Sequence, residues 1–445
     1  MEKHDVIVLG AGLAGLSAAR DLAAAGVDVI VVEARARAGG RVEQAKTPDG
    51  RLVQLGGEII GSFHTAYKEL VGELGLTLVP TFVASNGETS WSLADGSFLG
   101  DDLPWMSSGD RRVYDAIEKQ FSALAATVNP DDPWSHPDAE RLDALSIAEW
   151  VRGEGGSPSV LRALELSAKA LADSSIERSS LLAYLRKESA AGADGFYNYD
   201  AWENERVLEG SATVALRMAD DLGERIRYSS PVEQVRIDRR KSTVRLATGE
   251  ILGATAIVSA LPVGPLRDVR VEGVSDARMA SLHAQRNALT VKVAAVYPDS
   301  FWENDGRNGT SYMEQTLLGG TWAQSDGVLS GLLPPSSLAE YFATPLDRRQ
   351  AELTDELITV VGKQADEYSQ FYLRNWATDR WTQGYATGWR PGDVMAVGPL
   401  HGSHEPPFYV CGSDQWVCGY MEGAVRTGRA AAAAVLQGSE GKQSR

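Results

Sequence analysis

The feature that most constrains the fold of this chain is a glycine turn close to its N-terminus. Gly10, Gly12 and Gly15 have the spacing G-x-G-x-x-G directly after the apolar run at residues 6–9. An apolar run without polar alternation is typical of a strand buried on both faces of a parallel sheet. The glycines would then permit a tight turn, a close approach of the backbone to a pyrophosphate, and close packing of a helix on the strand.

The residues after the turn complete a dinucleotide-binding unit. Helix formers occupy residues 17–25, and a second apolar strand is expected over residues 27–32. Glu33 ends this strand 18 residues beyond Gly15, where its carboxylate can accept hydrogen bonds from ribose hydroxyls. The N–H groups at the start of the helix favour phosphates. The pattern therefore predicts a doubly wound α/β domain that binds a dinucleotide, without separating NAD from FAD.

A family resemblance separates the two cofactors. The stretches "EARARAGGR", which begins at Glu33, and "VQLGGEIIG", which follows it, resemble segments of the flavin-containing amine oxidase family. That family includes monoamine oxidases, polyamine oxidases and L-amino-acid oxidases. The resemblance implies FAD as the cofactor and assigns five further residues to it. These are Arg35, Gly40 and Arg41 in the segment that packs against the diphosphate, and Gly56 and Gly57 near the isoalloxazine ring.

Two distant segments match the same family. In "RIRYSSPVEQVRID", Val232 corresponds to a residue that contacts adenine through its backbone. In "FYVCGSDQWVCGYMEGAVRTGRAAAAAVL", Gly412 and Asp414 match a motif whose acid binds ribityl hydroxyls, and Met421 lies where an alanine-rich helix is expected to begin. The start of that helix would point at the cofactor. A single FAD site would thus be built from three separate parts of the chain.

The recurrence of these segments predicts two interleaved domains. We expect a Rossmann-type α/β domain that binds FAD and a mixed α+β domain that binds the substrate. The FAD-binding domain would comprise residues 1–77, 205–285 and 380–437, the substrate domain residues 78–204 and 286–379, and a polar tail residues 438–445.

Two residues of the substrate side carry expected roles in catalysis. Lys292 interrupts an apolar run that reads as a strand. The resemblance implies that it holds a water beside the flavin and assists the reaction with oxygen, where a cation would stabilise developing negative charge. The pattern alone also allows a lysine whose stem is buried and whose head reaches water. Tyr420 matches one of two aromatic rings that flank the amine in the family.

The second aromatic ring is missing at its aligned position, which is occupied by Ala386. Either Tyr385, Trp389 or Trp416 completes the wall, or the pocket is opened for a bulkier substrate. A cluster formed by Phe196, Tyr197, Tyr199 and Trp202 is a candidate entrance lining, although aromatic residues are as often part of a core.

Three further features bear on the cofactor and the substrate. Glu58 is a carboxylate in an apolar context and could bind a cationic group or serve an internal hydrogen-bonded role. Tyr385 stands where membrane-bound monoamine oxidases carry the cysteine that bonds to flavin, so FAD is expected to be non-covalent. The segment after Gly57 contains His64 and Lys68 but no arginine that could clamp an α-carboxylate, which favours amines over amino acids.

Composition excludes several classes of function. The net charge of −17 disfavours a nucleic-acid partner. Two cysteines and six scattered histidines predict neither a disulfide framework nor a metal site. No apolar run is long enough for a membrane span, and the N-terminus lacks the pattern of a signal peptide, so a cytoplasmic protein without a membrane partner is expected. Monomer and homodimer both remain open.

The function implied by the resemblance is that of an FAD-dependent amine oxidase, an oxidoreductase and flavoprotein. A hydride equivalent would pass from the amine to flavin N5, the imine would be hydrolysed to an aldehyde or ketone, and oxygen would be reduced to hydrogen peroxide. Three alternatives stay open: an L-amino-acid oxidase, a flavin desaturase or protoporphyrinogen-type oxidase, and a non-catalytic FAD-binding protein.

Overall fold

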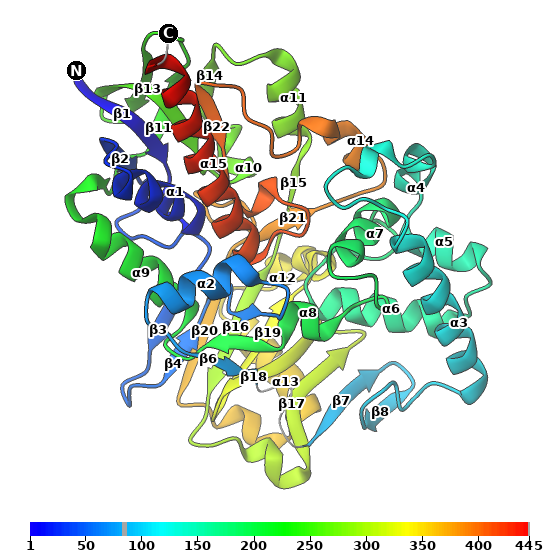
Figure 1. Cartoon of the computed structure of the whole chain (residues 1–445). Coiled ribbons are helices and arrows are strands. Elements are labelled where there is room, and N and C mark those ends of the chain that lie inside the picture. Colours follow the sequence, from blue (N-terminus) through cyan, green and yellow to red (C-terminus); the bar gives the residue numbers. More distant parts are fainter. Residues whose placement is uncertain (82–86, 444–445) are drawn as a thin grey trace.

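The computed structural model describes residues 1–81 and 87–443, with side chains described as far as Gly438. Figure 1 shows two large sheets, one beside the N- and C-termini and one at the opposite end of the molecule, with a group of helices flanking them. Within the described ranges, no helix combines the length and apolarity needed to cross a bilayer.

The first sheet brings together strands from three distant parts of the chain. β1 lies between β2 and β13, and all three run parallel. Across the sheet the order is β10 (Ile226–Arg227), β2 (Val29–Val32), β1 (Glu2–Leu9), β13 (Ile251–Ser259), β12 (Ser242–Leu246), β11 (Val232–Arg236) and β14 (Arg270–Glu272), with β22 (Phe408–Val410) also on β13.

Alternation along β1 explains its continuous apolar run. Val6 and Val8 belong to a core on one face of the sheet, whereas Ile7 and Leu9 belong to a second core on the other face. The prediction of a strand buried on both sides is therefore confirmed. The observed β1 begins at Glu2. The apolar pattern did not predict its first half because those residues are more exposed and polar. β2 begins at Val29 rather than at residue 27.

Three helices cover the face that includes Val6: α1 (Leu13–Ala24), α9 (Ser211–Leu222) and α15 (Tyr420–Gln443). α1 starts directly after Gly12, four residues earlier than predicted. It packs against α15 so closely that a Cβ on Gly428 would lie 2.3 Å from the carbonyl oxygen of Ala14. The expected polar tail at 438–445 continues α15 as far as Gln443, and its last two residues lie outside the described residues.

The second sheet places Lys292 toward the first domain. Alternate residues of its strand β16, Val291 and Val293, enter a core on the far face, while Ala294 and Val296 pack with Val53 on the near face. The order is β20 (Gln370–Asn375), β16 (Val291–Val296), β19 (Val328–Leu333), β18 (Gly320–Ser325), β17 (Arg307–Met313), β7 (Glu88–Leu93) and β8 (Gly96–Leu99).

A layer of helices with its own apolar core completes the substrate side. It consists of α3 (Ser108–Ala125), α4 (Ala139–Ala144), α5 (Ile147–Gly153), α6 (Pro158–Ala170), α7 (Leu181–Ala190) and α8 (Tyr199–Glu203). Smaller sheets join β5 (Ile59–Ile60), β9 (Glu205–Val207) and β6 (Leu78–Pro80), β15 (Arg286–Ala288) and β21 (Ala386–Gly388), and β3 (Gln44–Lys46) and β4 (Leu52–Gln54).

The two large sheets follow the expected interleaving of the chain. All strands of the first lie within residues 1–77, 205–285 and 380–437, and all strands of the second lie within residues 78–204 and 286–379. The α/β fold class is confirmed, while the individual domain boundaries stay a prediction.

Candidate active site

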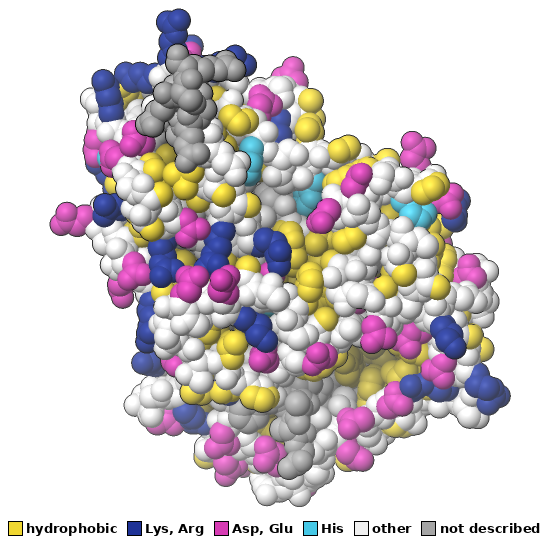
Figure 2. Space-filling view, in the orientation of Figure 1, with side chains coloured by type: hydrophobic (Ala, Val, Ile, Leu, Met, Phe, Trp, Pro, Cys, Tyr) yellow, Lys and Arg dark blue, Asp and Glu magenta, His cyan; other side chains and the backbone are white. Residues whose placement is uncertain are grey.

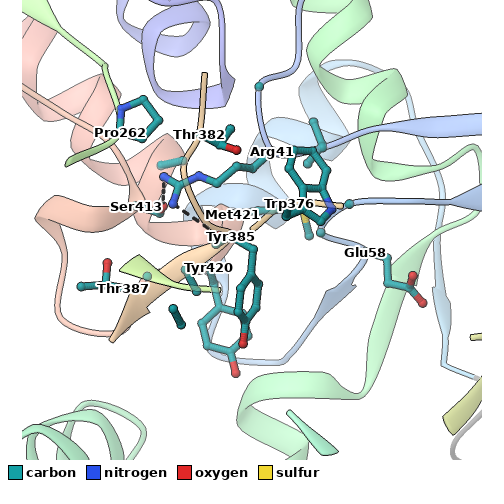
Figure 3. A pocket seen from close by; sticks show the side chains of 18 of the residues that line it. Arg41, Glu58, Pro262, Trp376, Thr382, Tyr385, Thr387, Ser413, Tyr420 and Met421 are labelled. Atoms are coloured by element: carbon teal, nitrogen blue, oxygen red, sulfur yellow. Dashed lines mark hydrogen bonds between the residues drawn. The ribbon is translucent and has the colours of Figure 1, made fainter. Parts of the chain in front are cut away.

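A cavity of about 460 Å³ is lined by residues of both sheets and of the helical layer. Figure 3 shows side chains from widely separated segments directed into it. Most of the residues selected from the sequence line this cavity. They are Gly10, Gly12, Glu33, Arg35, Gly40, Arg41, Gly56, Gly57, Glu58, Val232, Lys292, Tyr385, Ala386, Trp389, Gly412, Tyr420 and Met421.

Glu33 lies at the end of β2 with its carboxylate partly engaged. One oxygen accepts from the backbone N–H of Ala11 at 2.8 Å, and the other accepts from that of Arg35 at 2.8 Å. Each carboxylate oxygen can accept a further bond. The buried Glu33 thus fixes the glycine turn and keeps capacity for ribose hydroxyls.

The glycines leave bare backbone at the cavity surface. A Cβ on Gly412 would meet no atom within 4 Å, and one on Gly57 would come no closer than 3.6 Å to Met421. The space that these absent side chains would fill is part of the cavity. Gly15 is different because a Cβ there would lie 2.0 Å from the carbonyl oxygen of Gly10, so its role is to let α1 pack on the turn.

Two arginines of the "EARARAGGR" segment line the cavity, each with a carboxylate partner. Arg35 pairs with Asp379 at 2.5 Å. Arg41 donates to Asp414 at 2.7 Å and to the hydroxyl of Ser413 at 2.7 Å, and Figure 3 draws the bond to Ser413. These ion pairs hold two positive charges at the cavity wall, where a diphosphate could be placed.

Asp414 lies directly behind the cavity lining, and its expected contact with the cofactor stays a prediction. Its carboxylate is used by Arg41, by the hydroxyl of Thr387 at 3.2 Å and by the backbone N–H of Val263 at 3.2 Å. Burial alone would raise the pKa of Asp414, but Arg41 and these hydrogen bonds hold it below its usual value. Ser413 lines the cavity in its place.

Lys292 and Glu58 form a buried ion pair. The Lys292 Nζ donates to the Glu58 carboxylate and to the carbonyl oxygen of Gly56 at 2.9 Å. Glu58 also accepts from Trp322 Nε1 at 2.7 Å and from Gln324 Nε2 at 2.7 Å. Lys292 is 3% exposed, so it does not reach bulk water. Of the two roles that the sequence left open for Glu58, the geometry favours the internal one.

The ring of Tyr420 is held firmly at the first residue of α15. Its φ of 57° is in the left-handed region, which is rare for an aromatic residue and is found where strain serves a site. Trp202 stacks on the ring with centroids 5.3 Å apart, and the Tyr197 hydroxyl lies 3.2 Å from the Tyr420 hydroxyl. Burial raises the pKa of Tyr420 to about 12.

Tyr385 is the candidate for the second ring. Its hydroxyl donates to the carbonyl oxygens of Leu171 and Ala172, at 2.7 and 2.9 Å. Figure 3 shows its side chain directed into the same cavity as Tyr420. Trp389 also lines the cavity, and its ring packs edge-on against that of His401 with ring centroids 5.5 Å apart.

Trp416 is removed from the candidates for the second ring. It stacks on Phe63 with centroids 5.8 Å apart, and Arg426 lies 5.4 Å from its ring. A Cβ on Gly423 would lie 2.8 Å from the Trp416 ring, so this tryptophan packs on α15 outside the cavity lining.

Several lining residues were not selected from the sequence as site residues. Lys187 lies on α7, Asp173 follows α6, and Glu203 ends the short helix α8 in the aromatic cluster. Only the cluster itself, with Tyr197 and Tyr199 in the lining, was a usable signal. The burial of the charged residues results from long-range packing, which local periodicity does not show.

The residues present fit FAD. The glycine turn, the free acceptors of Glu33, the paired arginines and the bare backbone of Gly412 line the same cavity as Lys292 and Tyr420. A dinucleotide requires such a turn and an acidic acceptor, and a flavin enzyme requires its substrate groups in continuity with them.

Comparisons with known proteins agree with this geometry. The profile of the family described as flavin containing amine oxidoreductase matches residues 13–436. Putrescine oxidase from Kocuria rosea is 29% identical, and the match covers 98% of this chain and 95% of that protein.

Solved structures show the same similarity. Putrescine oxidase bound to putrescine superposes with a TM-score of 0.90 at 25% identity, covering 98% of this chain and 99% of the other. Cyclohexylamine oxidase from Brevibacterium oxydans IH-35A superposes with a TM-score of 0.88 at 27% identity and the same coverage. The match over nearly the whole chain, together with the cavity, shows an FAD-dependent amine oxidase, and the chain belongs to the flavin-containing amine oxidoreductase family.

Proposed function

We propose that the chain oxidises the neutral form of an amine held between the rings of Tyr385 and Tyr420, beside a non-covalently bound FAD. The observation that carries the proposal is the continuity of one cavity, which is lined by Glu33 and the glycine turn as well as by Lys292 and the two tyrosines. Bound FAD supplies the two-electron oxidation of the C–N bond and passes the electrons to oxygen, giving hydrogen peroxide and an imine that water hydrolyses.

The chain's own residues contribute orientation and exclusion of water. Tyr420 is fixed by Trp202 and by its backbone conformation, and Tyr385 is fixed by its hydrogen bonds to the segment after α6. Two rings held from outside the cavity restrict the amine to one approach. The two rings offer an ammonium group no anionic acceptor, and burial between them would remove its hydration, which favours the neutral form.

Lys292 is proposed to act on the oxygen side of the reaction. Its ammonium group has three N–H bonds, and Glu58 and Gly56 accept two of them. The third remains for a water molecule or for the negative charge that develops as oxygen is reduced. In this proposal Glu58 is a positioning residue that holds the Lys292 head at the cavity wall.

The absence of a covalent bond to FAD is proposed from Tyr385, which replaces the cysteine of membrane-bound monoamine oxidases. Cys418 also lines the cavity, but burial raises the pKa of its thiol, so the reactive thiolate is disfavoured. Acid precipitation should leave the yellow colour in the supernatant. Colour that stays with the denatured pellet would contradict this part of the proposal.

Amines are preferred over amino acids because neither basic residue after Gly57 is available to bind a carboxylate. His64 is fully buried and accepts from the N–H of Gly61 at 3.1 Å, and burial together with Lys187 lowers its pKa to about 3. Lys68 pairs with Glu205. Neither is placed to clamp an α-carboxylate.

A panel of amines and L-amino acids, assayed for hydrogen peroxide in air, tests this preference. Peroxide from amines alone is expected. Turnover of amino acids without turnover of amines would favour the L-amino-acid oxidase instead. A cytoplasmic location and a homodimer stay predictions.

A further inference from the structure

Lys187, on α7, places a charged group at the wall of the amine chamber. Its Nζ lies 4.6 Å from the ring centre of Tyr197, 5.2 Å from that of Trp202 and 5.6 Å from that of Tyr420. It lines the main cavity and also a second cavity of about 340 Å³ under the helical layer. Figure 2 shows a hollow with hydrophobic side chains on the β7–β8 side of these helices.

The ammonium group of Lys187 lacks a direct partner. Among residues 1–81 and 87–438, none accepts a hydrogen bond from its Nζ or forms an ion pair with it. Burial alone would lower the pKa of Lys187, but the carboxylates of Glu188 and Asp173, together with Tyr420 once it ionises at high pH, raise it above its usual value. The side chain therefore keeps its positive charge beside three aromatic rings.

Three carboxylates surround this charge without any basic partner in the described part of the chain. Glu188 accepts from the indole N–H of Trp202 at 3.4 Å. Asp173 accepts from the hydroxyl of Tyr184 at 2.8 Å. Glu203 lines the cavity, and burial raises its pKa. The positive charge of Lys187 acts on Glu188 and Glu203 and opposes the rise that burial causes in the pKa of each.

Four other titratable groups around Lys187 carry no charge. Burial raises the pKa values of Tyr197, Tyr420 and Cys418, so these groups stay protonated at neutral pH. His64 stays neutral because its pKa is lowered. On the main-cavity side the charges next to Lys187 are therefore the three carboxylates, while Arg111 and Glu118 line the second cavity with it.

We propose that Lys187 cancels the field of these carboxylates and thereby makes the amine chamber select a neutral amine. An ammonium ion has no lone pair and cannot be oxidised at its α-carbon. Aromatic faces backed by uncompensated carboxylates would form a strong ammonium site. With Lys187 in place the same faces remain, but the attraction for a second cation is removed.

A different role for Lys187, as an anchor for a substrate carboxylate, is less consistent with the structure. Glu188, Asp173 and Glu203 would all repel an anion brought to its Nζ. The test below distinguishes the two roles.

The experiment measures binding of benzyltrimethylammonium, a cation that cannot lose its charge, to the FAD-loaded protein through the change in flavin absorbance. Lys187→Met is expected to tighten this binding by at least about tenfold. It should also raise the pKa seen in the pH profile of kcat for a primary amine, because more of the bound amine stays protonated. Lys187→Arg keeps the charge and should behave as the wild type.

Lys119→Met is the matched control, since Lys119 is exposed on α3. Lys187→Gln is a second neutral variant in case Lys187→Met does not retain FAD. Unchanged affinity for the quaternary cation in the neutral variants overturns the proposal, as does a Lys187→Arg variant that behaves as they do. Loss of benzoate binding without a gain in cation binding would assign Lys187 to carboxylate recognition instead.

This inference rests on the proposed function, and the two can fail separately. Wild-type flavin that no amine bleaches would contradict the proposed function. Flavin that amines bleach, combined with unchanged cation affinity in Lys187→Met and Lys187→Gln, would contradict only the role of Lys187.

Discussion

The two ends of the cavity are built in different ways. The cofactor end uses backbone: a turn of three glycines, the bare chain at Gly412, and Glu33, whose carboxylate is tied to backbone N–H groups. The amine end uses single side chains that come from distant elements, such as Lys187 of α7, Lys292 of β16 and Tyr420 of α15.

This difference determines how each end responds to change. At Gly15 and Gly56 an added Cβ would lie about 2 Å from a backbone oxygen, so the cofactor end should fail completely at these two glycines. Side chains held by a few hydrogen bonds can be replaced one at a time. The amine end should therefore lose individual functions while the cofactor stays bound.

The largest effect is expected for Gly15→Ala. The added Cβ would lie 2.0 Å from the carbonyl oxygen of Gly10, so α1 must move away from the turn and FAD should be lost. The ratio of flavin to protein absorbance measures this. Gly72→Ala, where a Cβ meets no atom within 4 Å, should purify fully yellow. A Gly15→Ala protein that binds a full equivalent of FAD would contradict the view that the cofactor end depends on close backbone packing.

Lys292→Met should slow reoxidation by oxygen about 100-fold, while anaerobic reduction by an amine changes only a few-fold. Removal of one partner leaves Glu58 as a buried unpaired carboxylate, which costs about 3–5 kcal/mol of stability. The double variant Lys292→Met with Glu58→Gln should recover part of that stability and keep the slow reoxidation. Stopped-flow absorbance and urea unfolding provide the two measurements. Equal slowing of both half-reactions would contradict the assigned role.

Asp379 should give the cofactor end a measurable pH dependence. Burial alone would raise its pKa, but Arg374 and Arg35 hold it at about 2, below the unfolded value of about 3.9. Its stabilisation, at most about 2 kcal/mol, is therefore present above pH 4 and is lost as pH falls toward 2. The free energy of unfolding, measured with urea, should change less between pH 6 and pH 3 in Asp379→Asn than in the wild type. An identical difference in both proteins would contradict the prediction.

The smallest effect is expected for Tyr385→Phe. The change removes a donor from the carbonyl oxygens of Leu171 and Ala172 and keeps the ring, so stability should fall by about 1 kcal/mol. The kcat/KM for amines should fall less than about tenfold. Tyr228→Phe, at a more exposed position, is the control. A fall in kcat/KM of about 100-fold, as large as the slowing of reoxidation expected for Lys292→Met, would mean that the Tyr385 hydroxyl acts in the reaction itself.

The sequence predicted the cofactor end well because its chemistry is local. The glycine turn, the apolar strand and Glu33 follow one another within a short segment. The structural role of each can be recognised from its residue type and spacing. A motif match does not show which of two neighbouring side chains faces the cavity, and here Ser413 lines it while the contact of Asp414 with the cofactor stays a prediction.

The amine end was predicted only in part because its charges are paired through tertiary structure. The partner of Lys292 is Glu58, separated from it by more than 200 residues, so the pairing could not be read from either segment alone. Lys187 looked like an ordinary helix residue for the same reason. Trp416 had a suitable ring but packs on Phe63, which no local pattern indicates.

Anaerobic mixing of the FAD-loaded protein with a panel of amines tests most directly whether both ends serve one reaction. We expect the flavin absorbance to bleach with at least one amine and to return on admission of air, with an equivalent of hydrogen peroxide. Protein that binds FAD but whose absorbance no amine changes would contradict the account.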